Sequence, residues 1–367
     1  MILAAALASA DAVAAPVEVC DLPPRYGVEA TAAAIARTAC QEHRLWLRPF
    51  IEADGRLAAL AVTEAERARL DDGSTPAWQR VARYWRDSGT LAQLAGTPGA
   101  SSCMRPPGER STDNDCRAYL VDNPWSAAFI SWVMTQSSVP GFGASPRHID
   151  YIARAWRQPA TSPYTYEDPA TGKPAPGDLL CLLRDDDHGL GAAGMRAALS
   201  GQGRMPTRSH CDIVVAANVG GDRTLYLIGG NVLNAVMMRK LPLDRSGRLA
   251  PEVFATPPAG HAATAAAAAE PVPAAANGAG GREDLASPSP MPCSPGQPRA
   301  CGFNQRDWAV LLRLKPQAQL DALAPPNPSY VPRAAPASTP AGAPEPAGAP
   351  AAEPPAQAPE TLPAGGG

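Results

Sequence analysis

A series of short apolar runs in the second half of the chain limits the fold most strongly. Each run is bounded by Gly, Pro, Asn or Asp, which is typical of strands separated by turns. The runs cover residues 179–183, 210–215, 224–228 and 236–241, followed after a long gap by 307–314. Helical patterns precede this series and do not alternate with it. The sequence therefore predicts an α+β fold in which an antiparallel sheet of about five strands packs against helices.

Four segments before the strands repeat apolar residues at helical spacing. They are residues 27–50, 77–94, a helix from Pro124 to near Ser137, and 145–157. Residues 96–122 have no such pattern and are expected to form a loop. We expect the helices up to residue 100 to form an N-terminal region, 16–100, that packs against the domain that follows.

Composition sets the limits of that domain. Many of the 42 Pro and 32 Gly residues lie towards the C-terminus in Ala-Pro runs, which bury too little apolar surface to offset their ordering entropy. We expect a disordered tail at 317–367 and a low-complexity insertion at 256–298, because a strand pattern follows that insertion. This leaves one domain at 101–316. The net charge of −3 and the lack of a basic block do not suggest nucleic acid as a partner.

The N-terminal residues and the cysteines together indicate export. Residues 1–15 form an Ala-rich apolar segment with a signal-peptidase-like site, and we expect its true start to lie further upstream. The segment is too short to span a membrane. Eight cysteines, several of them flanking polar loops, are typical of an oxidising compartment. We therefore expect a periplasmic protein without a membrane span.

The spacing of the cysteines favours local disulfides. Three such bridges are expected: Cys20 with Cys40, Cys103 with Cys116, and Cys293 with Cys301. Cys181 and Cys211 fall in apolar strand runs, where either a bridge or two free core thiols would fit. The spacing does not match a four-cysteine zinc site.

Ser126 falls in the first turn of a helix, because Asn123 can cap that helix and Pro124 fits its first position. Free backbone N–H groups and the positive end of the helix dipole point to this turn. Ser126 is then either an activated nucleophile or a serine that helps the cap. His210 opens the second strand and Asn231 follows the third. If these strands are neighbours, Ser126, His210 and Asn231 can form a nucleophile, a base and an orienting group.

Four motifs appear in a characteristic order. They are Trp125-Ser-Ala-Ala-Phe129, Pro174-Ala-Pro-Gly-Asp178, Ser209-His-Cys-Asp-Ile-Val214 and Ile228-Gly-Gly-Asn231. Over about residues 120–245 and the last strand, the chain resembles the CHAP-type amidohydrolases and peptidases of the papain-like group. More narrowly, it is similar to a family of exported bacterial proteins of unknown function that carry serine in the first motif. The resemblance implies a papain-like fold with residue 126 as nucleophile, His210 as base and Asn231 as the orienting group.

Serine in place of the family's cysteine changes what the site requires. A hydroxyl does not ionise beside a helix end as a thiol does, so the base must take its proton during attack. Asp212 lies two residues after His210 and hence on the same strand face, where it either supplies a charge to the imidazole or is an ordinary polar residue. His148 is either a first-turn surface residue or lines a cleft, as Trp125 also could.

Three functions remain open from the sequence. The first is a peptidoglycan amidase or peptidase using Ser126. The second is a catalytically inactive CHAP-like module that binds wall peptide or a protein, and the third is a structural envelope protein that binds a partner. No phosphate-binding Gly loop, His-x-x-x-His pair or heptad repeat is present, so we expect no cofactor and no metal.

Overall fold

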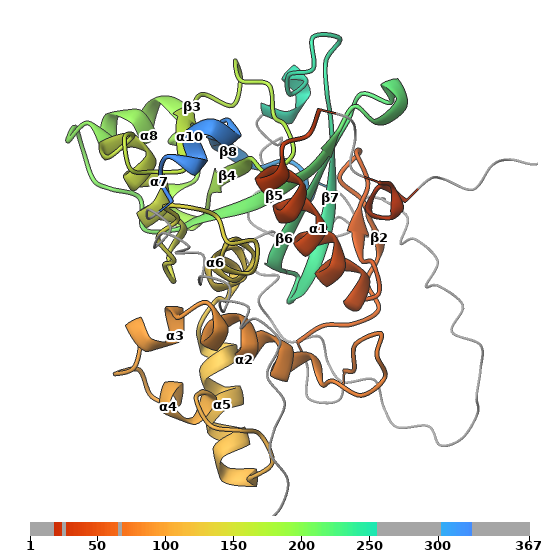
Figure 1. Ribbon diagram of the computed structural model, residues 1–367, viewed down its shortest axis with the longest axis vertical. Helices are drawn as coiled ribbons and strands as arrows, with labels where there is room; N and C mark the ends of the chain where they lie inside the picture. Colours follow the sequence, from red (N-terminus) through yellow and green to blue (C-terminus); the bar gives the residue numbers. More distant parts are fainter. Residues whose placement is uncertain (1–17, 24–26, 65–67, 255–301, 325–367) are drawn as a thin grey trace, which may run out of the picture. The chain divides into compact units, whose positions relative to one another are not determined.

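The computed structural model describes residues 18–23, 27–64, 68–254 and 302–324 (Figure 1). The expected leader, the insertion at 256–298, and Cys293 with Cys301 lie outside these residues, as does the tail beyond residue 324. The expected tail starts with a short helix, α10 (Gln317–Asp321). Among the described residues, no helix combines the length and the apolarity needed to cross a membrane.

The fold is α+β and is built on one mixed sheet of eight strands, in the order β2-β1-β7-β6-β5-β4-β8-β3. The strands are β1 (Phe50–Ile51), β2 (Leu57–Ala59), β3 (Tyr164–Glu167), β4 (Leu179–Leu183), β5 (Ser209–Ala217), β6 (Thr224–Val232), β7 (Ala235–Pro242) and β8 (Asp307–Leu314). The five expected strands are β4 to β8, and they are contiguous in the sheet.

The expectation of about five strands was too low, because the sheet has eight; the five expected strands do pair antiparallel with one another. Strands β1, β2 and β3 have two to four residues each, which is too short to show a two-residue period in the sequence. They extend the sheet at its two edges. Strand β1 pairs with β7 in parallel, so the sheet is mixed.

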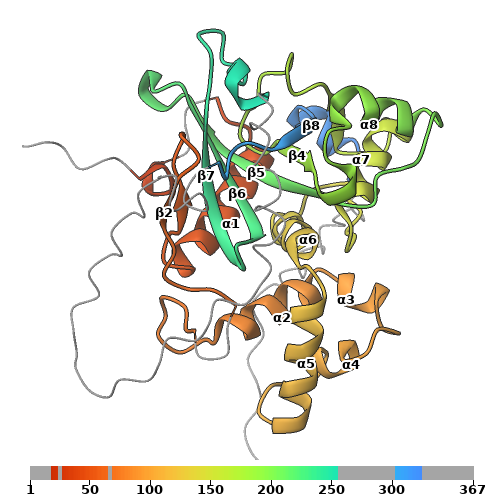
Figure 2. The same ribbon diagram turned by 180° about the vertical axis from the view of Figure 1, so that it is seen from behind.

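The helices gather on one face of the central strands and around α6. They are α1 (Ala30–Leu45), α2 (Ala77–Asp87), α3 (Thr90–Gln93), α4 (Ala100–Cys103), α5 (Arg110–Asp122), α6 (Ser126–Gln136), α7 (His148–Arg157) and α8 (Gly191–Leu199). Helix α1 lies across β5, β6 and β7, and α6 packs on β5 and β6 (Figures 1 and 2). Helices α2 to α5 form a group next to α6 on the side away from the sheet.

The expected loop at 96–122 instead contains α4 and α5. Helix α5 buries only four of its residues, Thr112, Cys116, Tyr119 and Leu120, so its apolar stripe is narrow and the sequence signal is weak. Asn123 ends α5 instead of starting α6, and its amide donates to the Tyr119 carbonyl at 2.8 Å.

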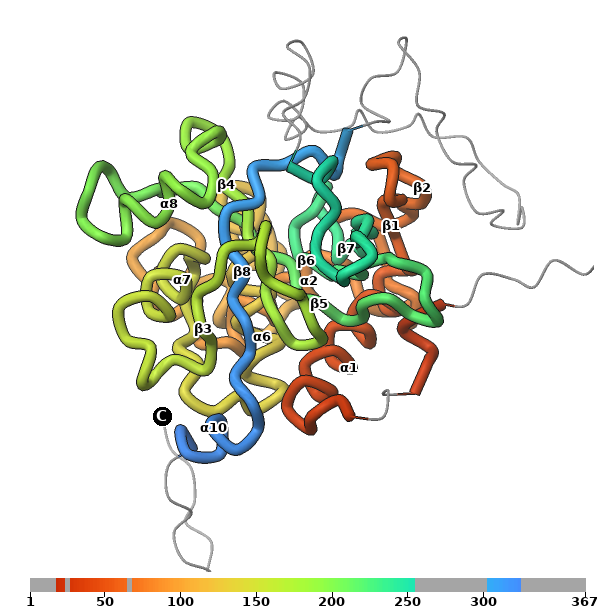
Figure 3. Tube along the Cα trace, turned by 90° about the horizontal axis from the view of Figure 1, so that it is seen from above, coloured from red at the N-terminus to blue at the C-terminus, as the bar shows by residue number. Residues whose placement is uncertain are grey.

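Strand β4 lies at the centre of the core, because all five of its side chains are buried. Alternate residues face two different clusters, with Leu179, Cys181 and Leu183 towards the helices and Leu180 and Leu182 in the second cluster. Burial on both faces explains why this strand is continuously apolar in sequence. Seen from above, β4 and β8 run side by side between β5 and β3 (Figure 3).

Three disulfides are present among the described cysteines. Two of the expected bridges, Cys20–Cys40 and Cys103–Cys116, are confirmed. The strand cysteines Cys181 and Cys211 also form a bridge, since they occupy directly paired positions on β4 and β5.

Asp178 explains the Pro-Gly-Asp turn in structural terms. Its buried carboxylate accepts hydrogen bonds from the backbone N–H groups of Ala175 and Leu314, each at 2.8 Å. Gly177 has a φ of +92° and lies close to Ala32. A Cβ on Gly177 would lie only 3.1 Å from the Cα of Ala32. The turn therefore ties the start of β4 to the end of β8 and to α1.

Trp125, a candidate cleft residue, is fully buried and belongs to the core. Its ring stacks on Trp46 with centroids 5.7 Å apart, and its indole N–H donates to the Glu64 carboxyl. Burial raises the pKa of Glu64 to about 8, against the opposing effect of the Trp125 hydrogen bond.

Glu64→Gln should flatten part of the dependence of stability on pH. The folded pKa lies above the unfolded value, so the folded state binds more protons and its stability falls as pH rises from about 5 to 9. Glutamine keeps an acceptor for Trp125 but does not titrate. Urea unfolding at several pH values should show the wild type losing roughly 1–4 kcal/mol relative to Glu64→Gln across this range. Parallel curves for the two proteins would contradict this.

Candidate functional site

Ser126 occupies the first position of α6, and the expectation that it lies in the first turn is confirmed. Its Oγ lies 2.7 Å from Nε2 of His148, which is the first residue of α7. Both side chains are buried, at 5% and 4% exposure. The starts of two helices thus bring a hydroxyl and an imidazole into direct hydrogen-bond contact.

His148 is a buried site residue and not a surface residue of the first turn. Its Nδ1 forms a hydrogen bond with the Tyr151 hydroxyl one turn later on α7. Burial lowers the pKa of His148 well below its usual value; His210 lowers it further, while the Asp212 charge opposes the shift. The imidazole is therefore neutral at pH 7.

His210 and Asp212 form a second pair beside this contact. His210 Nε2 lies 2.7 Å from Asp212 Oδ1, and Arg239 Nε donates to Asp212 Oδ2 at 3.2 Å. All three side chains are buried, and the centroid of the His210 ring lies 5.3 Å from that of His148. The sequence left two interpretations of Asp212. In the structure its carboxylate contacts the imidazole, as the first of them requires.

The charges in this pair follow from its surroundings. Burial disfavours the ionised Asp212, but His210 and Arg239 outweigh burial and lower the pKa of the carboxyl to about 2. Burial also lowers the pKa of His210, although Asp212 opposes the shift. A neutral His210 therefore donates its Nε2–H to a carboxylate. Its Nδ1 is buried and has no hydrogen-bond partner among the described residues.

Asn231 does not orient His210. It lies near the end of β6, where the pairing with β7 shifts register and its φ is +57°. Strands β5 and β6 are neighbours as expected, but the Nε2 of His210 bonds to Asp212. Likewise Ser126 bonds to His148 and not to His210.

The two glycines before Asn231 make the site possible. A Cβ on Gly229 would lie 1.8 Å from Asp212 Oδ1 and 3.1 Å from His210 Nε2. A Cβ on Gly230 would lie 2.4 Å from Cβ of Phe129 on α6. The glycine pair therefore lets the His210–Asp212 pair and helix α6 both approach the backbone of β6.

The geometry allows acid–base chemistry at Ser126. A hydroxyl can donate or accept a hydrogen bond. His148 can therefore carry its proton on Nδ1, where the N–H donates a hydrogen bond to the Tyr151 hydroxyl. Its Nε2 then accepts a hydrogen bond from the Ser126 hydroxyl. The first backbone N–H groups of α6 have no acceptor within the helix and can bind an oxyanion. Arg239 was missed, because it lies within an apolar run. His148 was a candidate cleft residue, but its contact with Ser126 was not predicted.

A cavity of about 390 Å³ adjoins the starts of α6 and α7. Its lining residues are Trp85, Gln93, Leu94, Asn123, Pro124, Pro146, Arg147 and Asp150. Pro124 stands two residues before Ser126, and Arg147 directly precedes His148. The cavity therefore lies near the two helix starts, but neither Ser126 nor His148 belongs to its lining.

One group of residues in the described part of the chain has the spacing of metal ligands: Glu18, Cys20 and His43. Cys20 is bridged to Cys40, so its sulfur is not available as a thiolate. This group therefore lacks the thiolate that a metal site with Cys20 as a ligand would need.

Comparison with known proteins gives one finding. No curated protein and no solved structure matched the chain. Residues 72–314 match a family described as an uncharacterized protein conserved in bacteria, DUF2272, and this span contains Ser126, His148, His210, Asp212 and Arg239. Because the match covers more than half of the chain, the protein belongs to the DUF2272 family.

Proposed function

We propose that this protein is an exported hydrolase that cleaves an amide bond of peptidoglycan, with Ser126 as nucleophile in a CHAP-like, papain-like site. The observation that carries the proposal is the 2.7 Å contact between Ser126 Oγ and His148 Nε2 at the start of α6. Nucleophile and base within hydrogen-bond reach are the minimum for acyl transfer. The order of the four motifs supports the substrate class, and the disulfides fit an oxidising compartment.

In the proposed reaction, Ser126 Oγ attacks the amide carbonyl carbon while His148 Nε2 takes the hydroxyl proton. The first N–H groups of α6 stabilise the oxyanion of the tetrahedral intermediate. Collapse breaks the C–N bond, and the leaving amine takes the proton from His148. Water, deprotonated by His148, then hydrolyses the acyl ester and restores Ser126.

The negative charge of the His210–Asp212 pair assists the proposed proton transfer to His148. The imidazolium that forms on His148 is buried, which is costly unless a negative charge lies close by. Asp212 supplies that charge across His210, whose ring centroid is 5.3 Å from that of His148. In this proposal the Tyr151 hydroxyl orients His148 and Asp212 supplies only charge. An ionised carboxylate stabilises the cation better than a neutral amide would.

A second candidate is an inactive CHAP-like module that binds wall peptide or a protein. It is favoured by the same burial, because the low pKa of His148 makes its imidazole a weak base and Ser126 is only 5% exposed. In that case the Ser126–His148 hydrogen bond only joins α6 to α7.

Ser126→Ala separates the two candidates. The full chain should react covalently with a fluorophosphonate probe and release soluble fragments from purified peptidoglycan, and Ser126→Ala should lose both by at least about 10³-fold. The matched control is Ser137→Ala at the other end of α6, where the hydroxyl bonds to Thr38 at 3.1 Å; this variant should behave as wild type. Chromatography and mass measurement of the products would name the bond.

Two results would overturn the catalytic proposal. One is equal probe labelling of wild type and Ser126→Ala. The other is no labelling and no release by the wild type together with sedimentation of the protein on peptidoglycan, which would establish the binding module. Strong hydrolysis only after Ser126→Cys would identify a site that needs a thiol.

A further inference from the structure

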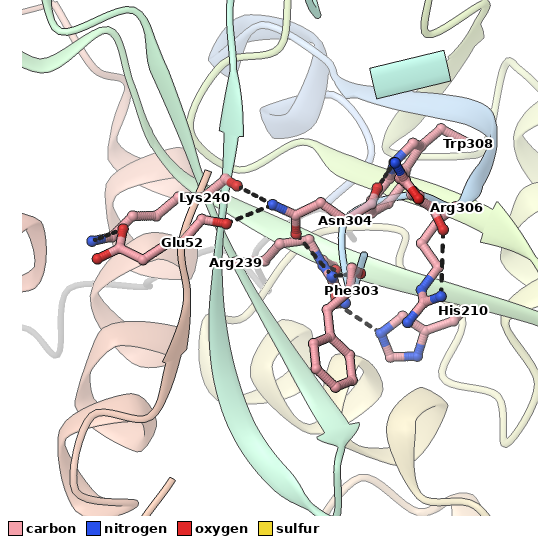
Figure 4. A network of polar contacts seen from close by, with 10 residues as sticks. Glu52, His210, Arg239, Lys240, Phe303, Asn304, Arg306 and Trp308 are labelled. Carbon is pink, nitrogen blue, oxygen red and sulfur yellow. Dashed lines mark hydrogen bonds and ion pairs between the residues drawn. The ribbon is translucent and has the colours of Figure 1, made fainter. Parts of the chain in front are cut away.

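The segment that leads into β8 is held against the His210–Asp212 pair by Asn304. The Asn304 amide donates to the backbone carbonyls of Glu52 at 2.7 Å and Lys240 at 2.8 Å (Figure 4). Its Oδ1 accepts from Arg239 Nη1 at 3.1 Å, and the same guanidinium binds Asp212. The position of this segment is thus linked to the site by a continuous set of hydrogen bonds.

Arg306 lies on this segment between two fixed points. Asn304 stands two residues before it, and two residues after it the Trp308 indole donates to the Asn304 carbonyl at 3.2 Å. The Arg306 side chain is mostly buried and points towards the ring of His210 (Figure 4). Its guanidinium Nη1 donates to the Gln305 carbonyl at 3.3 Å.

No carboxylate of the described chain forms an ion pair with Arg306. Asp212 is already bonded to His210 through one oxygen and to Arg239 through the other. Burial and the positive charges of Arg239 and Arg184 together lower the pKa of Arg306 to about 9, against the opposing effect of Asp212. Both oxygens of Asp212 are thus occupied, and the Arg306 guanidinium has no carboxylate of its own among the described residues.

We propose that Arg306 binds a carboxylate of the substrate close to the scissile amide. This inference rests on the proposed function, because it assigns the substrate class of the same site. A mostly buried guanidinium with one backbone partner is costly in the free protein, and a carboxylate supplies both the missing charge and two acceptors for its planar fork. The substrate would thus be a peptide that carries a free carboxylate.

Binding to a protein that does not turn over tests this without requiring hydrolysis. In the Ser126→Ala full chain, calorimetry should show N-acetyl-Ala-Ala binding at least about tenfold more tightly than its C-terminal amide. Arg306→Gln in the same background should remove the preference, and Arg306→Lys should retain part of it. Arg313→Gln is the matched control, because Arg313 is only partly buried and pairs with Glu167 at 3.7 Å; it should keep the full preference.

Several outcomes would overturn the proposal: no binding of the acid, equal binding of acid and amide, or an unchanged preference in Arg306→Gln. Inorganic phosphate that binds in an Arg306-dependent manner while the acid does not would assign the site to another anion. The outcome is independent of the proposed activity. A protein that fails the probe and peptidoglycan assays can still show Arg306-dependent carboxylate binding, and an active enzyme can lack it.

Thermal unfolding provides a second readout that a merely structural arginine would not give. Removing a buried charge that lacks a counter-ion relieves repulsion from Arg239 and Arg184, so Arg306→Gln should raise the Tm of the free protein while binding of the acid is lost. A lower Tm would mean that Arg306 serves the fold, and the anion site would then be rejected.

Discussion

Asp212→Asn is expected to lower the free energy of unfolding by about 3–5 kcal/mol, because it leaves the buried Arg239 guanidinium without its counter-ion. The same change removes the negative charge next to the two histidines and lets the new amide bind the wrong tautomer of His210. Reaction at Ser126 should fall on the order of 10²–10⁴-fold. Urea unfolding and the rate of fluorophosphonate labelling measure the two effects.

A double variant distinguishes the structural from the chemical part. Arg239→Met added to Asp212→Asn removes the unpaired charge and should restore part of the lost stability, since the two residues are in contact and couple. Labelling should remain as low as in Asp212→Asn. If Asp212→Asn alone unfolds like the wild type, the buried ion pair does not hold this part of the fold, and if labelling is unchanged, Asp212 has no role at Ser126.

Gly229→Ala should have a smaller effect on stability but a similar effect on the reaction, through shape alone. The new Cβ would lie 1.8 Å from Asp212 Oδ1, which is far inside van der Waals contact, so the carboxylate must move away from His210. We expect about 1–3 kcal/mol of destabilisation and a loss of Ser126 labelling similar to that of Asp212→Asn.

Gly96→Ala is the matched control, because a Cβ at Gly96 meets no atom within 4 Å. It should retain wild-type stability and labelling. A Gly229→Ala protein that also keeps both would show that β6 can shift without disturbing the His210–Asp212 pair.

The central strands could be predicted because their burial leaves a clear pattern of apolar residues in the sequence. A strand buried on both faces is continuously apolar, and a strand buried on one face alternates apolar and polar residues. Strands β4 to β8 were all found in this way, and β8 was recognised even after the long insertion. Strands β1, β2 and β3 were missed because they are short, and because the pairings of β1 with β7 and of β3 with β8 join distant parts of the sequence. Helix α5 was missed because tertiary contacts support a mostly polar sequence.

The site could be predicted only where local rules fix a side chain. The helix start placed Ser126, and the two-residue period of a strand put Asp212 on the same face as His210. The contact of His148 with Ser126 depends on how α7 packs beside α6, which no local pattern specifies. Asn231 was expected to orient His210, but Nε2 of that ring bonds to Asp212 and its Nδ1 has no partner among the described residues.

The position of β8 has a consequence for the order in which the molecule can form. Strand β8 lies between β4 and β3, and the sheet neighbour of β3 is β8. A chain made from its N-terminus exposes one hydrogen-bonding edge of β4 until residues 307–314 arrive. Pairing over so long a stretch of sequence is slow. Pairing of β8, the last described strand, therefore completes the sheet. A chain cut before β8 would expose an unpaired strand edge and tend to aggregate instead of forming a smaller native domain.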